Sequence, residues 1–102
     1  MDPCDVRQLI DLVPHMIFAK DRAGRFLLVN RAMADAYGLS ATELVGRTHL
    51  DVHPVPDEVR EMLEHDRAVI DSQERKVIPE QVFTDIHGQR HCLRTVKIPF
   101  AL

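Results

Sequence analysis

The sequence is 102 residues long, 45% hydrophobic and 28% charged, which is the size and composition of one ordinary globular domain. Its formal net charge is −3 with both signs scattered along the chain, so the clustered positive charge of a nucleic-acid interface is absent and we expect no nucleic-acid partner. The sequence also lacks a long apolar run, a signal-peptide pattern and paired cysteines, so we expect no membrane contact by this chain and a cytoplasmic location.

The first 14 residues predict a separate amphipathic helix. Asp2 and Pro3 are suited to the N-cap and the first helical position, and Pro14 ends the pattern. The apolar residues between them follow helical spacing: Val6, Leu9, Ile10 and Val13. This apolar stripe requires a partner, which is either the sheet of its own domain or the same helix in a second copy.

Residues 16–46 predict a β-hairpin followed by short helices. Two short apolar runs flank a turn that begins at Asp21, as expected for a hairpin. Asn30 is suited to cap the next helix, and Gly38 is suited to end it in a left-handed conformation. Residues 40–43 then have the spacing of a capping box, which predicts one further helical turn.

A longer helix is predicted after Pro54–Asp57, with an irregular stretch before it. Its apolar side consists of Val59, Met62, Leu63, Val69 and Ile70. Asp66 lies in the middle of this stripe, where an unpaired buried charge would cost several kcal/mol. We interpret Asp66 as a structural carboxylate that accepts hydrogen bonds from backbone amides or a nearby cation and attaches the helix to a loop.

The last third of the chain predicts a second, longer β-hairpin. Apolar pairs at 77–78 and 82–83 precede a turn at Asp85–Gly88 and a strand from Arg90 to about Ile98. In that strand residues 93, 95 and 97 share one face, and residues 92, 94, 96 and 98 share the other. The order of elements predicts an α+β domain in which short helices cover one face of an antiparallel sheet.

Two series of motifs point to a known family. The first series is Val13-Pro14-His15-Met16-Ile17-Phe18-Ala19-Lys20-Asp21, Gly24, Val29-Asn30, Gly38, Ser40, Glu43-Leu44, Gly46-Arg47 and Asp51. The second is Asp66-Arg67-Ala68-Val69, Gly88 and Lys97-Ile98-Pro99-Phe100. In order and spacing they resemble a PAS domain. The resemblance implies a PAS-like antiparallel sheet with short helices on one face over residues 15–102, preceded by the helix of residues 1–14.

The sequence departs from the PAS pattern at its C-terminal end. The family's sheet has five strands in the spatial order 2-1-5-4-3, and only Ala101 and Leu102 follow Phe100, so the central fifth strand is missing. The two hairpins would then present unpaired backbone groups in the middle of the sheet. We expect this 102-residue chain either to dimerise through these edges or to be unstable.

The resemblance implies a sensory or signal-relay domain of a bacterial signal transduction protein, such as a histidine kinase of a two-component system, a diguanylate cyclase or a transcription regulator. Such a domain binds a small ligand or mediates dimerisation, so we expect a small-molecule ligand and self-association. Candidate pocket residues, chosen by the faces they occupy, are Ile17, Tyr37, Met62, His65, Val69, Val82 and Val96. The alternative is a structural dimerisation module with a filled core and no ligand.

Haem-based gas sensing is a third hypothesis. His65 lies at a position similar to that of the axial histidine in haem PAS domains, near one edge of the apolar stripe. The absence of a cofactor is nevertheless the leading expectation, and haem is less favoured. Covalent flavin photochemistry is disfavoured because residues 38–60 contain no cysteine.

Metal and catalytic sites are not predicted. His49, Asp51 and His53 alternate and would share one face on an extended backbone, as metal ligands do, but PAS relatives carry comparable polar segments without metal. The sequence has no glycine-rich phosphate loop, nucleophile elbow or spaced acid–base pair. We therefore expect a regulatory module without catalytic residues, although a parent protein can carry a kinase or cyclase domain.

Overall fold

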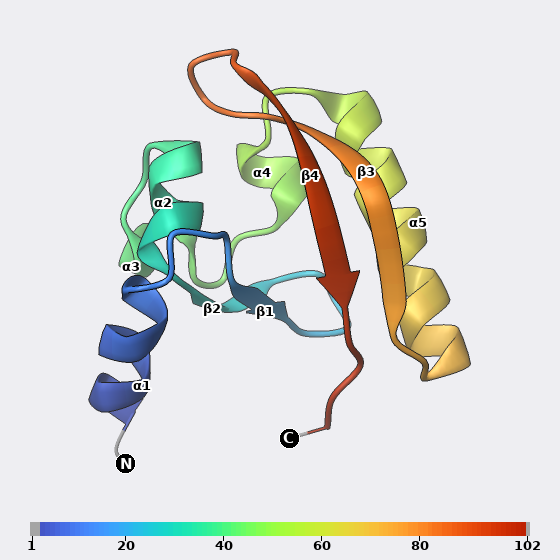
Figure 1. Cartoon of the computed structure of the whole chain (residues 1–102), viewed down its shortest axis with the longest axis horizontal. Coiled ribbons are helices and arrows are strands. Elements are labelled where there is room, and N and C mark those ends of the chain that lie inside the picture. The colour runs from blue at the N-terminus through green and yellow to red at the C-terminus, as the bar shows by residue number, and fades with distance from the viewer. Residues whose placement is uncertain (1–2, 102) are drawn as a thin grey trace. The chain divides into compact units, whose positions relative to one another are not determined.

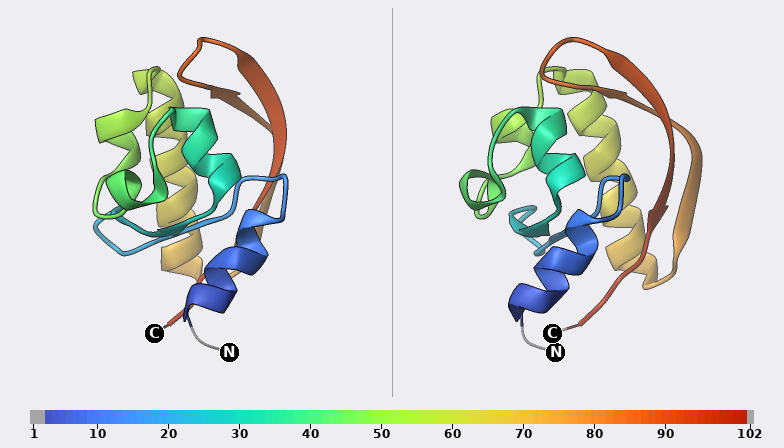
Figure 2. Two further views of the ribbon diagram at one scale, coloured as in Figure 1. Left: turned by 90° about the vertical axis from the view of Figure 1, so that its left-hand side faces the viewer. Right: turned by 60° about the vertical axis from the view of Figure 1, so that its left-hand side comes forward.

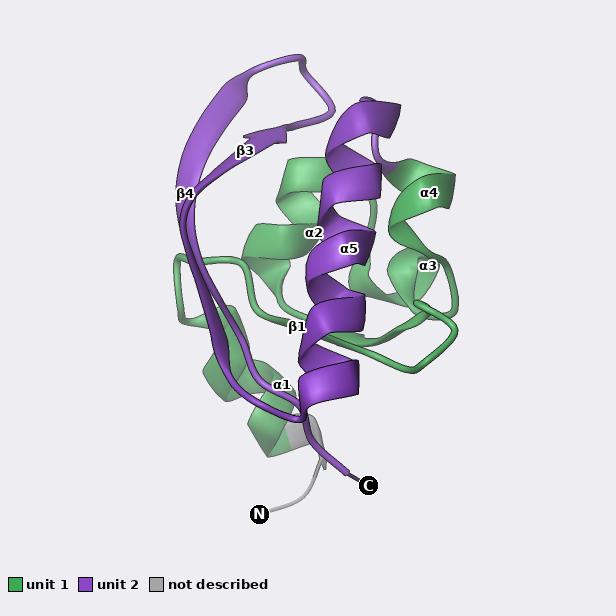
Figure 3. Ribbon diagram, turned by 90° about the vertical axis from the view of Figure 1, so that its right-hand side faces the viewer, with its two compact units in different colours: residues 1–52 green, residues 53–102 purple. Residues whose placement is uncertain are grey.

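A computed structural model describes residues 3–101 of the chain, and the side chains of residues 5–101. The chain divides into two compact units, Met1–Val52 and His53–Leu102 (Figure 3). Both contain helices and an antiparallel hairpin (Figure 1), which confirms the α+β class. No helix within residues 3–101 has the length and apolar character needed to span a bilayer.

The first unit contains a short hairpin and four helices. Helix α1 spans Pro3–Asp11, the strands β1 and β2 span Phe18–Lys20 and Phe26–Val29, and α2, α3 and α4 span Arg31–Tyr37, Ala41–Leu44 and His49–Val52. Strand β1 pairs antiparallel with β2, and α3 packs against β2. Apart from α4, these elements were expected from hydrophobic spacing and turn residues.

Helix caps explain where the short helices begin and end. Asn30 caps α2, and Gly38 ends it at φ 65°, which is the left-handed region that glycine tolerates best. The predicted capping box of α3 is formed, because the Ser40 hydroxyl accepts from the Glu43 amide and the Glu43 carboxylate accepts from the Ser40 amide.

Helix α4 is the element that the sequence did not predict, since residues 48–54 were expected to be an irregular loop. The Thr48 hydroxyl accepts from the Asp51 amide at 3.3 Å, and the Asp51 carboxylate accepts from the Thr48 amide at 3.0 Å. This is the reciprocal pattern of a capping box, and it stabilises one helical turn. The backbone and side-chain hydrogen bonds with Thr48 hold the pKa of Asp51 below its usual value.

Asn30 is the polar centre of the first unit and is fully buried. Its Oδ1 atom accepts from the amides of Ile17 and Met33, at 3.0 and 3.1 Å. Its Nδ2 atom donates to the carbonyls of Ile10 and His15, at 3.0 and 2.8 Å. One side chain therefore connects the end of α1, the segment before β1 and the first turn of α2.

The second unit consists of one long helix and one long hairpin. Helix α5 spans Pro56–Ser72, and the antiparallel strands β3 and β4 span Lys76–Thr84 and Arg90–Lys97. The two strands form a curved ribbon (Figure 2), and α5 packs against β3. The buried apolar side chains of this unit are Val59, Met62 and Val69 of α5 and Ile78 and Phe83 of β3.

Each sheet of the described residues has two strands. Strand β1 pairs with β2 and β4 pairs with β3, and no further strand of residues 3–101 pairs with the second edge of either β1 or β4. The expected pairing of these edges with a second copy of the chain stays a prediction.

Candidate functional site

The predicted pocket residues fall into both units. In the first unit Ile17 is half-buried and Tyr37 is buried. In the second unit Met62 and Val69 are buried and His65 is half-buried, and their spacing places all three on one side of α5. A binding role for these residues stays a prediction.

Tyr37 belongs to a buried cluster of rings around His49. The Tyr37 hydroxyl lies 2.8 Å from His49 Nδ1, and the rings of Phe18 and Phe26 meet the imidazole edge-to-face, with centroid distances of 5.4 and 4.8 Å. Only 2% of His49 is exposed. From the sequence, His49 was predicted to lie in a polar loop. The local pattern of residues indicated neither helix α4 nor the rings that surround this histidine.

The alternating His49, Asp51 and His53 do not act together. His49 packs among rings and Asp51 caps α4, whereas His53 follows that helix and bonds within the second unit. No group of three or more His, Cys, Asp or Glu side chains in the described part of the chain is arranged to hold a metal ion.

His65 has an unusual environment. Its Nε2 atom is buried and has no hydrogen-bond partner within residues 5–101. The nearest carboxylate oxygen, Glu61 Oε1 one turn earlier, is 3.7 Å away, which is too far for a hydrogen bond. A buried polar atom without a partner costs about 1–3 kcal/mol, so this side chain is suited to a group that would complete it.

Val82 and Val96 do not lie on the buried face of the hairpin. They are 38% and 40% exposed, whereas Gln81 and Phe83 are buried. A bulge between Ile78 and Gln81 shifts the alternation of β3, so that Val82 points outward although Ile78 points inward. The face chosen for these two valines from the sequence therefore differs from the structure.

An ion pair helps to explain which face of β4 is the more buried one. Lys97 Nζ donates to Asp66 Oδ1, and both side chains are largely buried. Asp66 on α5 is thereby connected to β4, and residues 91, 93, 95 and 97 take the more buried face. Lys97 rather than Val96 faces the helix because it neutralises the carboxylate there.

A second polar cluster joins the start of α5 to the end of β3. Glu58 Oε1 accepts from the Thr84 amide at 2.7 Å and lies 2.8 Å from His53 Nε2, while Glu58 Oε2 accepts from the Thr84 hydroxyl at 2.7 Å. Burial opposes ionisation of Glu58, but the hydrogen bonds from Thr84 and His53 outweigh it and lower its pKa. No local pattern predicted this cluster, since its members are up to 31 residues apart.

The turn between β3 and β4 is organised by Asp85. Its Oδ1 atom accepts from the amides of His87 and Gln89, both at 2.9 Å, and Oδ2 lies 2.9 Å from His91 Nε2. The hydrogen bond with His91 lowers the pKa of Asp85. His87 is exposed and His91 partly so, whereas the buried Asp85 fixes the hairpin turn.

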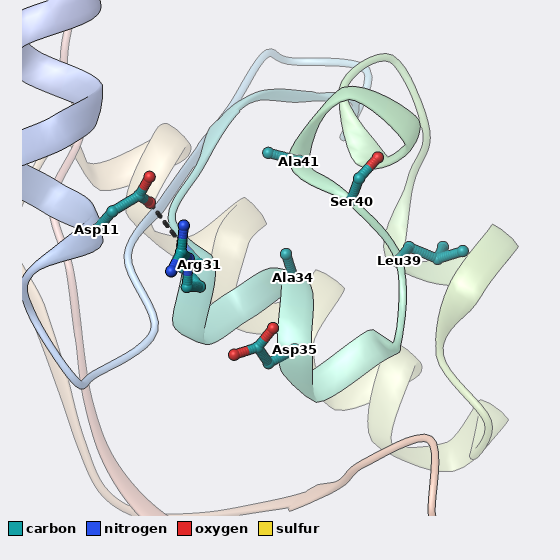
Figure 4. Close-up of a pocket in the computed structure, with 7 residues that line it drawn as sticks. All are labelled: Asp11, Arg31, Ala34, Asp35, Leu39, Ser40 and Ala41. Carbon is teal, nitrogen blue, oxygen red and sulfur yellow. Dashed lines mark hydrogen bonds between the residues drawn. The ribbon is translucent and has the colours of Figure 1, made fainter.

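A surface hollow of about 260 Å³ lies entirely within the first unit (Figure 4). It is formed by the end of α1, one side of α2 and the start of α3. The lining residues are Asp11, Arg31, Ala34, Asp35, Leu39, Ser40 and Ala41. The sequence singled out none of its polar side chains except the cap Ser40.

Residues 10–101 match the profile of the PAS fold family, which is most of the chain. The chain belongs to the PAS family. The virulence sensor protein BvgS of Bordetella pertussis is 32% identical over 97 residues, or 93% of this chain and 8% of that protein. BvgS of Bordetella bronchiseptica gives the same values. The chain thus spans only 8% of these relatives, and it corresponds to a PAS sensor domain, a regulatory module in signalling.

Solved structures, PAS domains among them, have the same fold. VqmA of Vibrio cholerae, in a complex with ligand and DNA, superimposes with a TM-score of 0.82 at 22% identity, over 98% of this chain and 45% of the VqmA chain. The PAS domain of an HTR-like protein from Haloarcula marismortui gives a TM-score of 0.67 at 20% identity, over 97% of this chain and 84% of that one. At these identities the likeness establishes the fold.

The expectation that nucleic acid is excluded as a partner is wrong. VqmA, which shares this fold, is found in a complex with DNA. The expectation rested on the charge of 102 residues, and a domain without a basic patch can be part of a protein that binds DNA. The charge pattern therefore describes this segment and does not limit the partners of a protein that contains it.

Proposed function

We propose that the chain is the sensory and signal-relay PAS domain of a bacterial signal transduction protein, and that it binds a small ligand. In this proposal residues 15–102 belong to the PAS domain, and the preceding helix α1 passes the signal on. The likeness to BvgS over 93% of the chain supports an output of the sensor-kinase kind, and the likeness to VqmA leaves a transcription regulator open.

The observation that carries ligand binding is the unsatisfied Nε2 atom of His65. It lies on the side of α5 that carries the buried Met62 and Val69, so a ligand there would contact apolar surface and one polar atom. Binding sites commonly combine an apolar lining with few polar groups. A ligand that hydrogen-bonds His65 recovers the free energy lost by burying this atom.

Signalling requires the ligand to distinguish two arrangements of the domain. A ligand with equal affinity for both arrangements shifts no equilibrium, however tightly it binds. A hydrogen bond to His65 gives such a difference if the atom is buried in one arrangement and hydrated in the other. Movement of α5 relative to its hairpin is the change that this requires.

Native mass spectrometry after gentle purification tests the proposal. We expect the wild-type chain to retain a small molecule, and His65→Phe to lose it at unchanged thermal stability, because the ring fills space but offers no polar atom. His87→Phe, at an exposed turn, is the matched control and retains the ligand. Two results contradict the proposal. One is that His65→Phe and the wild type retain the small molecule equally, and the other is that neither of them binds any small molecule, retained or added.

The same preparation tests haem as the ligand. An axial histidine is one of the ligands that proteins give to haem iron, and the buried His65 Nε2 fits that donor role. Haem binding predicts a Soret band after haem addition that is absent in His65→Phe. A colourless wild-type chain after haem addition removes this hypothesis and leaves an organic ligand.

A second candidate function, dimerisation, is favoured by the outer face of the β3–β4 hairpin. Val77 lies opposite Val96, and Val82 lies opposite Cys92, on the exposed side of both strands. Val77, Val82 and Val96 are 37–40% exposed, so two cross-strand pairs leave apolar surface uncovered within the described residues. Arg94 lies opposite the exposed Pro79–Glu80 bulge between these pairs.

This surface is suited to a second copy of itself. In a two-fold arrangement the apolar pairs meet their equivalents, and Arg94 of each protomer lies near Glu80 of the other. Sedimentation velocity tests this arrangement: Val96→Glu should give monomer where the wild type is dimeric, and Ile86→Glu, at an exposed turn residue, should leave the dimer intact. A dimer that survives Val96→Glu contradicts this interface.

A further inference from the structure

The hollow of the first unit has a chemistry distinct from the environment of His65. We propose that it binds a free α-amino acid with a small aliphatic side chain, as a second ligand site of the domain (Figure 4). The proposal is independent of His65, because all seven lining residues belong to α1, α2, α3 and their connections in the first unit.

Small side chains create the space. Ala34 is buried in α2 and Ala41 is the first residue of α3, so neither extends into the hollow by more than a methyl group. Gly38 turns the chain with a left-handed φ of 65°, which separates the start of α3 from the side of α2. The volume of about 260 Å³ is slightly less than that of sites for drug-sized ligands, and it suits a molecule of amino-acid size.

The rim carries both signs of charge. Arg31 and Asp35 lie one turn apart on α2, and neither their guanidinium nor their carboxylate has an ion-pair or hydrogen-bond partner within residues 5–101. Asp11 Oδ1 accepts from the Arg31 amide at 2.7 Å, which fixes this carboxylate at the hollow and leaves Oδ2 for another donor. The Ser40 hydroxyl, also at the hollow, accepts from the Glu43 amide and is engaged in the capping box.

These groups match the parts of an amino acid. The ammonium group is suited to Asp35 and the open oxygen of Asp11, and the carboxylate is suited to the Arg31 guanidinium, which binds carboxylates in a planar, bidentate geometry. The methyl groups of Ala34 and Ala41 offer a small apolar surface to a short aliphatic side chain. A simple carboxylate or a simple amine would satisfy only one half of the rim.

The test is an NMR titration of the 102-residue chain with L-alanine, and with acetate and methylamine as half-ligands. We expect L-alanine to shift the backbone amides of residues 31–41 with a dissociation constant of about 1 mM, because exposed charge pairs are individually weak. Acetate and methylamine should each bind at least about fivefold more weakly. Equal binding of all three, or L-alanine shifts confined to other residues, overturns the proposal.

Two variants with matched controls assign the site. Asp35→Asn should weaken L-alanine binding about fivefold, whereas Asp57→Asn, at an exposed carboxylate of α5, should leave it unchanged. Ala41→Leu should abolish the shifts by filling the hollow, whereas Ala68→Leu on the exposed side of α5 should not. Asp35 is exposed, so its variant is expected to fold, and an unchanged amide spectrum verifies this. Wild-type affinity in either site variant overturns the proposal.

Discussion

Asn30 and Asp11 connect helices α1 and α2, because each side chain hydrogen-bonds a backbone group at the end of the other helix. Asn30 donates to the carbonyl of Ile10 near the end of α1, and Asp11 of α1 accepts from the first amide of α2. Each helix therefore satisfies orphan backbone groups of the other, which fixes α1 to the unit without a large apolar contact. This matters for a relay, because the exposed α1 would otherwise be held by few buried residues.

Asn30→Asp tests this connection. The aspartate keeps the oxygen that caps α2 but replaces the donating amide with a second acceptor, so the carbonyls of Ile10 and His15 lose their partner. We expect a loss of about 2–3 kcal/mol in the free energy of unfolding, and faster hydrogen exchange in α1. Ser40→Ala, which removes an exposed cap, should cost about 1 kcal/mol and leave exchange in α1 unchanged. Unchanged α1 protection in Asn30→Asp would show that other contacts hold the helix.

Glu58 gives a prediction about pH. Its pKa is lowered in the folded state below the ordinary value of 4.5, so its contribution to stability is complete above that value and is lost as pH falls through the folded value. We expect Glu58→Gln to cost about 1–2 kcal/mol at pH 7 and to show a smaller loss of stability on acidification than the wild type. Urea unfolding at neutral and acidic pH measures both effects. Glu64→Gln, at an exposed position of α5, is the control, and the same pH slope in both variants would contradict the assignment.

At the scale of secondary structure elements, an ion pair between Asp66 and Lys97 connects α5 to β4. Lys97→Met leaves the largely buried Asp66 without its lysine, and we expect a loss of about 2 kcal/mol in the free energy of unfolding. Asp66→Leu combined with Lys97→Met should recover part of this loss, because the charge is then removed with its partner.

The exposed pair of Arg60 and Asp57 on the same helix is the matched control. These side chains are 71% and 84% exposed, so Arg60→Met should change stability by less than about 0.5 kcal/mol. Chemical denaturation of the wild type and these three variants gives the comparison. Equal effects of Lys97→Met and Arg60→Met would show that burial does not strengthen the Lys97–Asp66 pair.

The elements themselves were predictable where the signal is local. Caps at Asn30 and Ser40, the glycine at the end of α2 and the apolar spacing of α5 are read within a few residues, and these elements formed as expected. The buried face of β3 and of β4 was harder to predict, because it depends on a bulge and on the ion pair between Lys97 and a carboxylate 31 residues away. Alternation indicates two faces but does not decide which of them is buried.

The candidate sites were harder to predict for the same physical reason. Met62, His65 and Val69 follow from the period of one helix, and the structure places them on its apolar side. The ring cluster around His49 and the hollow beside Arg31 instead require segments that meet only after folding. The polar cluster of Glu58, His53 and Thr84 is of this second kind, because Thr84 is 26 residues from Glu58.

At the scale of the whole molecule, the family match covers residues 10–101, and the described strands form two separate pairs. Strand β4 has eight residues without a proline, and its second edge is unpaired within the described residues. An open edge of this length is a template for another strand. The composition of a single domain therefore does not guarantee that this chain stays monomeric.

Hydrogen exchange at micromolar and near-millimolar concentrations tests the role of the open edges. We expect amides in residues 18–20 and 90–97 to become more protected as concentration rises, because strand pairing between copies engages backbone groups. Val96→Glu distinguishes pairing of the open strand edges from packing of the outer face of the hairpin. The substitution should leave edge pairing intact and should disrupt packing of that face. Protection that is independent of concentration in a chain that sediments as a monomer would contradict edge pairing and show that this segment folds stably by itself.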